Sequence, residues 1–205
     1  MKKLVLIFLS SILLTFSLYA NAVIKGTKQS LENDALSCSA MFYIMTSIED
    51  ENYNKMITKI SMSMRHIYGW IASANRDQEV TNGFLSDNTG MRAKELGKIY
   101  DRDNKALSRI YAQCNTWRGE VSEYLLSLKD LNLKEINKNN SFNIDRMKNV
   151  VAKFPTVKKY NEINIPPHKE EIYDYQVKVG MKAWDKLNRL TTKDFKKKLL
   201  EIMRK

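Results

Sequence analysis

Two cysteines carry the most informative chemistry in this chain of 205 residues. Cys38 and Cys114 each lie on an apolar stripe with helical spacing, so two helices packed side by side would bring them together. In an oxidising compartment a lone pair of cysteines usually forms a disulfide. A redox-active pair is the alternative, but the chain has no C-x-x-C motif and no clear activating charge pattern around either thiol. We therefore predict a structural disulfide between Cys38 and Cys114.

Histidine and methionine offer a second chemistry, copper binding, because a soft thioether suits Cu(I). His66 follows Met62 and Met64, but these methionines are two residues apart and would point to different sides of a helix. Met64 also belongs to an apolar seam, so we interpret it as a core residue. His168 follows a proline pair, as a residue at the start of a helix would. We expect no metal site and no cofactor.

Glu49, Asp50 and Glu51 form the densest acidic cluster, and paired carboxylates can cleave a glycosidic bond. That reaction needs one carboxylate in an apolar setting, whereas these three lie among polar residues at the end of an expected helix. We interpret them as a solvated helix end. The chain also lacks the G-x-S-x-G and H-E-x-x-H motifs and a glycine-rich phosphate loop. A cell-wall-acting enzyme is therefore a secondary alternative, with no catalytic residue assigned.

Residues 1–22 have the pattern of a secretory signal peptide. Two lysines precede an apolar run that ends at Leu18, and Ala20 and Ala22 provide an A-x-A-like cleavage site. The run is shorter than the ~20 apolar residues that span a bilayer, which disfavours an uncleaved membrane anchor. We expect cleavage after Ala20 or Ala22, and export to the periplasm or out of the cell.

Apolar residues recur at helical spacing along most of the remaining chain. The clearest case is a heptad seam of residues three and four apart. Its members are Leu107, Ile110, Cys114, Trp117, Val121, Tyr124 and Leu128. We predict helices at about 31–48, 52–74 and 102–129. Within 78–101 we expect an irregular or bent helix, because each of three glycines weakens a helix by about 1 kcal/mol.

These helices would form an all-α fold, an antiparallel four-helix bundle over residues 23–128 stapled by the disulfide. Composition changes after residue 128. Residues 129–205 contain 19 basic and 10 acidic residues, and so hold +9 of the net charge of +11, whereas residues 23–128 are neutral. We describe residues 129–205 as a basic helical extension. Its expected helices are a short one before Pro155, one over 168–190, and a last one capped by Thr192.

The basic extension indicates a partner, because an excess of one charge attracts anionic surfaces. The candidate binding residues are Lys178, Lys182, Lys193, Lys196, Lys197, Lys198 and Arg204. The last helix has a narrow apolar face and could lie in a membrane interface, or pack on the bundle. Tyr173, Tyr175 and Trp184 alternate with lysines in a way that permits base stacking. Export argues against nucleic acid as the partner.

Small exported helical proteins with a disulfide include toxin-neutralising immunity proteins and phage proteins that block lysis or superinfection. This likeness is one of architecture only, and it assigns no function to any residue of this chain. We expect a non-enzymatic periplasmic protein that binds an envelope protein. The alternatives are a protein tethered by its basic region to anionic lipid or cell-wall polymer, and an enzyme. The heptad seam leaves the oligomeric state open, because it can pack on its own chain or on a second copy.

Overall fold

A short apolar helix, α2 (Leu31–Met45), lies at the centre of the fold and contacts α3, α4, α5 and α8. This computed structural model describes residues 31–128 and 143–188. The described residues form six α-helices and a 3-10 turn, without a strand, which confirms the all-α prediction. The other elements are α3 (Glu51–Arg76), α4 (Asn82–Arg102), α5 (Asn104–Ser127), α7 (Ile144–Val151), η2 (Tyr160–Glu162) and α8 (Pro167–Asn188).

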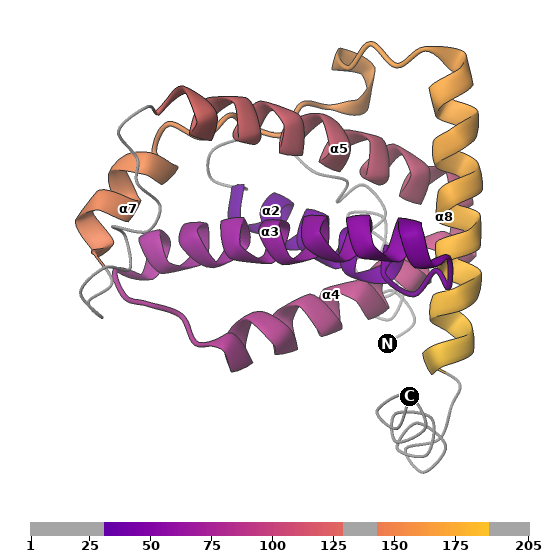
Figure 1. Cartoon of the computed structure of the whole chain (residues 1–205), viewed down its shortest axis with the longest axis horizontal. Coiled ribbons are helices and arrows are strands. Elements are labelled where there is room, and N and C mark those ends of the chain that lie inside the picture. Colours follow the sequence, from indigo (N-terminus) through magenta and orange to yellow (C-terminus); the bar gives the residue numbers. More distant parts are fainter. Residues whose placement is uncertain (1–30, 129–142, 189–205) are drawn as a thin grey trace, which may run out of the picture.

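The position of α2 follows from its composition. Eleven of its fifteen residues are buried, among them small residues such as Ala35, Ser39 and Ala40 that let neighbouring helices approach closely. A helix with apolar or small residues around most of its circumference is stable only when other elements surround it. Figure 1 shows this arrangement, with α3 in front of α2, α5 above and α4 below.

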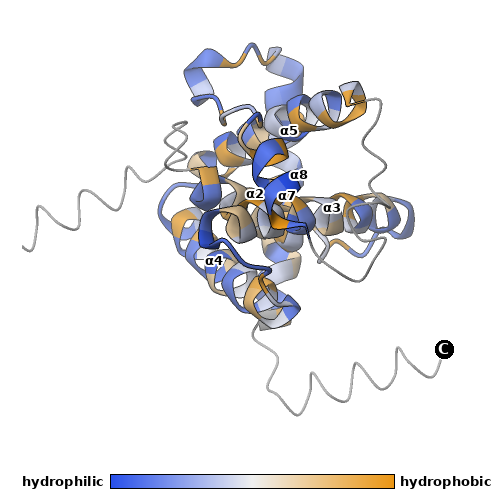
Figure 2. Cartoon of the chain, turned by 90° about the vertical axis from the view of Figure 1, so that its left-hand side faces the viewer, coloured by the Kyte–Doolittle hydropathy of each residue, from blue (hydrophilic) through white to orange (hydrophobic). Residues whose placement is uncertain are grey.

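The C-terminal helices share the same core. In Figure 1, α8 runs across one end of α3 and α5, and α7 lies at the opposite end. Met147 of α7 and Val177 of α8 are fully buried, and both belong to the hydrophobic cluster that surrounds α2. Viewed from the α7 end, the helices turn mainly hydrophobic residues inward (Figure 2). The described helices of residues 129–205 are therefore built into the bundle.

Most helix boundaries lie close to the expected ones, but the third helix differs in kind. We expected an irregular or bent helix within 78–101, and the irregularity is wrong, because α4 is one continuous helix of 21 residues. Thr81 caps its first turn, and Leu85, Ala93 and Leu96 are buried on its inner face. Tertiary packing of this face outweighs the cost of the glycines. The expected last helix, capped by Thr192, lies outside the described residues.

The turn between α4 and α5 is held by a single residue. Asp103 ends α4 in an extended conformation, and its carboxylate accepts a hydrogen bond of 3.1 Å from the backbone N–H of Ala106. An aspartate in this position satisfies a free amide of the first helical turn and suits the positive end of the helix dipole. The turn leaves the last residues of α4 beside the first residues of α5, where they face α8.

The disulfide between Cys38 and Cys114 joins α2 to α5, as predicted. Both cysteines are completely buried, in the heptad seam of α5 and in the facing stripe of α2. The two residues are 76 apart in the sequence, and the closed loop contains α3 and α4. The disulfide thus fixes the central helix α2 to α5, the helix that carries the predicted heptad seam.

We expect the Cys38→Ala/Cys114→Ala variant to lose about 4 kcal/mol of unfolding free energy, because a loop of this length strongly restricts the unfolded chain. Urea unfolding with and without reductant measures the loss. The reduced wild type should match the variant, and reductant should leave the variant unchanged. A loss below about 1 kcal/mol would contradict a stabilising role for this bond.

Tyr68 of α3 contributes a pH-dependent term to stability. Its side chain is almost completely buried and its ring stacks on Phe84 with centroids 6.4 Å apart. Burial, helped by the nearby Glu32 carboxylate, raises the pKa of Tyr68 to about 12. The phenol of an unfolded chain titrates near pH 10. Between about pH 10 and 12 the unfolded chain therefore loses a proton that the folded chain keeps, which favours unfolding.

We expect the Tyr68 contribution to be complete below pH 10 and to be lost as pH rises toward 12. At pH 11 the wild type should lose roughly 1 kcal/mol more than Tyr68→Phe, relative to pH 8. Urea unfolding of both proteins at the two pH values provides the comparison. The variant should still decline, because burial also raises the pKa of Tyr53. Equal declines in the two proteins would rule out the role of Tyr68.

Candidate functional site: a basic groove between α4 and α8

Helices α4 and α8 line a groove of about 670 Å³. Four lysines and two aspartates contribute to it, which leaves a net positive charge. The lining residues are Lys94, Gly97, Lys98, Tyr100 and Asp101 of α4, and Lys178, Met181, Lys182, Trp184 and Asp185 of α8. A second hollow of about 340 Å³ shares Tyr100 and Lys178 and extends the groove to the start of α5, where it adds Lys105. We call the two hollows together the basic groove.

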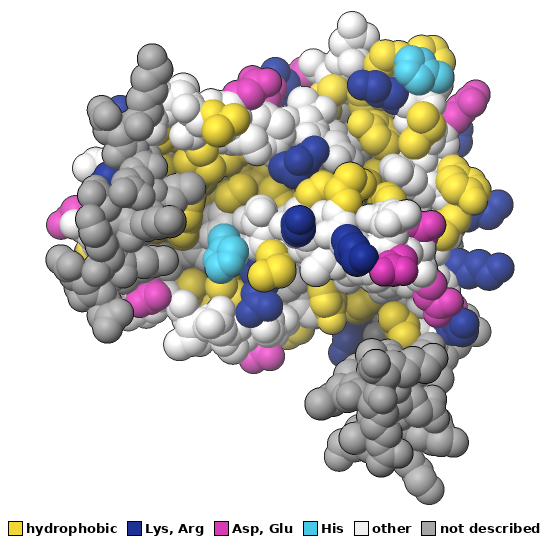
Figure 3. Space-filling model, in the orientation of Figure 1, with side chains coloured by type: hydrophobic (Ala, Val, Ile, Leu, Met, Phe, Trp, Pro, Cys, Tyr) yellow, Lys and Arg dark blue, Asp and Glu magenta, His cyan; other side chains and the backbone are white. Residues whose placement is uncertain are grey.

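The four lysines of the larger hollow stand in two pairs. Lys94 and Lys98 are four residues apart on α4, and Lys178 and Lys182 are four residues apart on α8, so each pair lies on one helix face. Like charges at this spacing repel each other. Within residues 31–128 and 143–188 none of the four lysines makes an ion pair. Figure 3 shows Lys and Arg side chains along the side of the molecule that carries α8. This arrangement favours an anion between the two helices.

The floor of the basic groove is apolar. The Met181 side chain is buried and reaches over Gly97, whose missing Cβ would be 3.7 Å from the Met181 methyl carbon. Beside it, the ring of Trp184 packs edge-to-face on Tyr43 of α2, with centroids 5.4 Å apart. Charged groups at the rim and an apolar floor together suit a partner that carries both acidic and apolar groups.

Aromatic side chains of α8 pack on the neighbouring helices and hold α8 in place. This packing determines which of its rings are exposed and available to stack on bases. Tyr173 packs edge-to-face on Tyr111 of α5, with centroids 5.4 Å apart, as Trp184 does on Tyr43 of α2. Of the three rings that alternate with lysines in the sequence, only Tyr175 is largely exposed, at 69%. Two of the three rings thus serve packing within the bundle.

The close approach of α8 to α2 depends on Gly180. A Cβ at this position would lie 2.7 Å from the sulfur of Met45, a distance that real Cβ atoms do not show. Met45 is completely buried, so its side chain has no free space to move into. Gly180 therefore sets the position of α8, and with it the positions of Lys178 and Lys182.

Sequence reasoning identified half of the lysines in the main hollow. Lys178 and Lys182 lie in the basic groove, as exposed residues of α8. The other candidate binding residues lie outside the described part of the chain: Lys193, Lys196, Lys197, Lys198 and Arg204. Lys94 and Lys98 were missed because they belong to the electrically neutral part of the sequence. Their spacing of four on one helix face was the available signal.

The acidic cluster Glu49–Glu51, at the start of α3, has structural contacts. Asp50 caps α3 by accepting a hydrogen bond of 2.7 Å from the backbone N–H of Tyr53. Glu51 pairs with Lys55 at 2.8 Å. Glu49 lies 3.8 Å from the ammonium group of Lys186 on α8. These contacts agree with the interpretation of the cluster as a solvated helix end.

The candidate metal ligands lie apart. Met62 is 58% exposed whereas Met64 is completely buried, so the two thioethers point in different directions. His66 is exposed beside a hollow that also includes Glu79, and His168 is exposed at the start of α8. The described segments contain no group of three or more His, Cys, Asp or Glu that could hold a metal ion. In the same segments, no helix has the length and hydropathy needed to cross a membrane.

We expect Gly180→Ala to lower the free energy of unfolding by about 1–3 kcal/mol, because the new methyl group overpacks the contact with Met45. Gly119→Ala in α5 is the matched control, since nothing lies within 4 Å of a Cβ there. The control should gain up to about 1 kcal/mol from helix propensity. Urea unfolding of the two variants decides the matter, and similar changes in both would refute the packing role of Gly180.

Comparisons with known proteins found no matching family model, curated protein or solved structure.

Proposed function

We propose that this protein is an exported, non-enzymatic binding protein that holds an acidic segment of an envelope protein in the basic groove. The observation that carries the proposal is the set of four lysines, two from α4 and two from α8, that face one groove without an ion pair in the described part of the chain. An anionic partner would relieve their mutual repulsion. Its attraction would also speed the encounter between the two proteins.

The shape of the site supports a protein segment over a flat anionic surface. The lysines surround a hollow large enough for several side chains, and Met181, Trp184 and Tyr100 offer apolar contact inside it. A segment that alternates acidic and apolar side chains could fill this hollow. A planar bilayer could reach the lysines but not the floor. Burial of an apolar anchor surrounded by charged contacts is the usual origin of affinity at such interfaces.

A carboxylate in the basic groove would contribute specificity. Asp101 of α4 lies on the same lining as the lysines. A partner that placed an acidic side chain against this aspartate would be repelled, so the charges of the partner must fall at defined positions. A simple polyanion lacks such positions. The mixture of charges therefore favours one partner segment over anionic polymers in general.

Two features of the chain support export, the disulfide and the N-terminal sequence. A disulfide such as Cys38–Cys114 is typical of proteins that fold in an oxidising compartment. Residues 1–22 have the features of a signal peptide, with cleavage after Ala20 or Ala22. An exported binding protein of this kind would act as an inhibitor, an immunity protein or a phage-exclusion protein.

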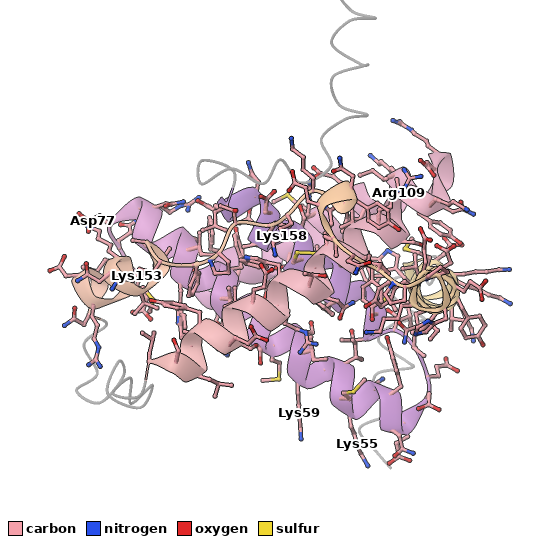
Figure 4. The ribbon with its side chains drawn as sticks, turned by 90° about the horizontal axis from the view of Figure 1, so that it is seen from above. Lys55, Lys59, Asp77, Arg109, Lys153 and Lys158 are labelled. Atoms are coloured by element: carbon pink, nitrogen blue, oxygen red, sulfur yellow. A yellow bond between two sulfur atoms is a disulfide. The ribbon has the colours of Figure 1, made fainter. Side chains whose placement is uncertain are left out.

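We expect neutralising the basic groove to weaken binding of a synthetic peptide that alternates Glu with Trp and Leu. Lys98→Gln/Lys182→Gln should weaken it roughly tenfold, because each exposed charge contributes up to about 1 kcal/mol. Lys59→Gln/Lys153→Gln is the matched control, since it removes one charge from α3 and one from the turn after α7, away from the basic groove (Figure 4). Calorimetric titration at low salt gives the affinities, and the control should stay within about twofold.

The same three proteins, the wild type and the two double variants, distinguish the tether from the binding protein. Equal weakening by the groove and control variants would mean that binding follows net charge, and would overturn the proposal. Sedimentation with vesicles of anionic lipid is the second arm. If the wild type binds vesicles more tightly than the peptide, and salt removes that binding, the tether is the better description. Capture from an envelope extract that Lys98→Gln/Lys182→Gln abolishes then identifies the natural partner.

A further inference from the structure

A second cavity, between α2, α3 and α4, differs in chemistry from the basic groove. Its volume is about 480 Å³, and most of its lining side chains carry a hydroxyl or an amide. Arg65 of α3 is the single charged residue on the lining, which includes no carboxylate. We call this cavity the hydroxyl pocket. It shares no lining residue with the basic groove.

The inner end of the hydroxyl pocket has a hydrogen-bond donor without an acceptor. Ser39 and Thr89 are 1% and 5% exposed, and their hydroxyl oxygens are 3.3 Å apart. Only one of the two hydroxyls can donate to the other. Neither has a second hydrogen-bond partner in the described part of the chain. One buried O–H group is therefore left to donate into the pocket, and leaving such a donor unpaired is unfavourable.

Other donors converge on the same space. Arg65 uses one N–H group, from Nη2, to bind the backbone oxygen of Asn82 at 3.1 Å, which leaves most of its guanidinium free. Ser61 and Ser86 line the pocket, and their hydroxyls make no hydrogen bond among the described residues. In contrast, the Thr58 hydroxyl donates to the side-chain oxygen of Asn54 at 2.9 Å, so its proton is not available to a ligand.

This inventory of donors and acceptors selects the class of ligand. The pocket has a surplus of donors, one guanidinium and no anionic acceptor, so a ligand must supply strong acceptors and negative charge. The cavity is several times larger than one oxyanion, which leaves room for an organic body. Tyr43 and Met62 line the pocket and are 42% and 58% exposed, so they offer that body aromatic and apolar contact.

We propose that the hydroxyl pocket binds a small organic molecule that carries an oxyanion, either a phosphate or a carboxylate. The oxyanion lies between the guanidinium of Arg65 and the hydroxyls of Ser39 and Thr89. The organic body faces Tyr43 and Met62. This site is independent of the partner proposed for the basic groove.

The test is calorimetric titration of the full chain with phenyl phosphate, benzoate and neutral benzyl alcohol. The first two probes distinguish the two sources of an oxyanion, and the third measures what the ring alone contributes. Arg65→Gln should weaken oxyanion binding about tenfold or more, because hydrogen bonds to charged groups are strong. Lys182→Gln is the control, since it removes a charge from the basic groove instead. This control should keep the affinity for the oxyanion probes within about twofold of the wild-type affinity.

A second variant guards against loss of folding, because Arg65→Gln also removes the contact with Asn82. Ser86 is exposed, so Ser86→Ala keeps the fold and should weaken binding about threefold. Equal effects of Arg65→Gln and Lys182→Gln would overturn the site. So would binding of benzyl alcohol as tight as that of the anions, or no binding of either anion at millimolar concentrations.

Discussion

The burial of α2 around most of its circumference is the constraint on which the rest of the structure depends. Eleven of its fifteen residues are buried, so α3, α4, α5 and α8 must pack around it. The disulfide from Cys38 to Cys114 fixes the helix covalently to α5. Both candidate sites then form at the edges of this packing. Tyr43 near the end of α2 lines the hydroxyl pocket and packs on Trp184 of the basic groove, so one residue supports both.

The sequence predicted the elements that depend on local periodicity. The seam around Cys114 and the short helix before Pro155 were identified because apolar residues three and four apart define a helix face without further information. The continuity of α4 was not predicted. Glycine propensity argues against it, and contact with α2, α3 and α5 supplies the compensating burial. The close approach at Gly180 was equally hidden, because it depends on Met45, a residue far away in the sequence.

The candidate sites were harder to predict than the helices for a related reason. Two lysines on α8 drew attention because the surrounding sequence is basic, whereas Lys94 and Lys98 lie in a neutral region and completed the groove only when α8 packed nearby. The hydroxyl pocket corresponds to a weaker signal in the sequence. Asn54, Thr58, Ser61 and Arg65 form one stripe on α3, and such a stripe normally indicates a solvated face. Only the approach of α2 and α4 turns it into a cavity.

The position of the covalent loop has a consequence for the local stability of the two sites. All of the residues that line the hydroxyl pocket lie between Cys38 and Cys114, inside the closed loop. The basic groove has α4 inside the loop and α8 outside it. Native-state hydrogen exchange can therefore distinguish the two sites, because only the groove depends on a helix outside the loop. An opening event that releases α8 removes half of the groove, while the pocket keeps all three of its walls within one cross-linked segment.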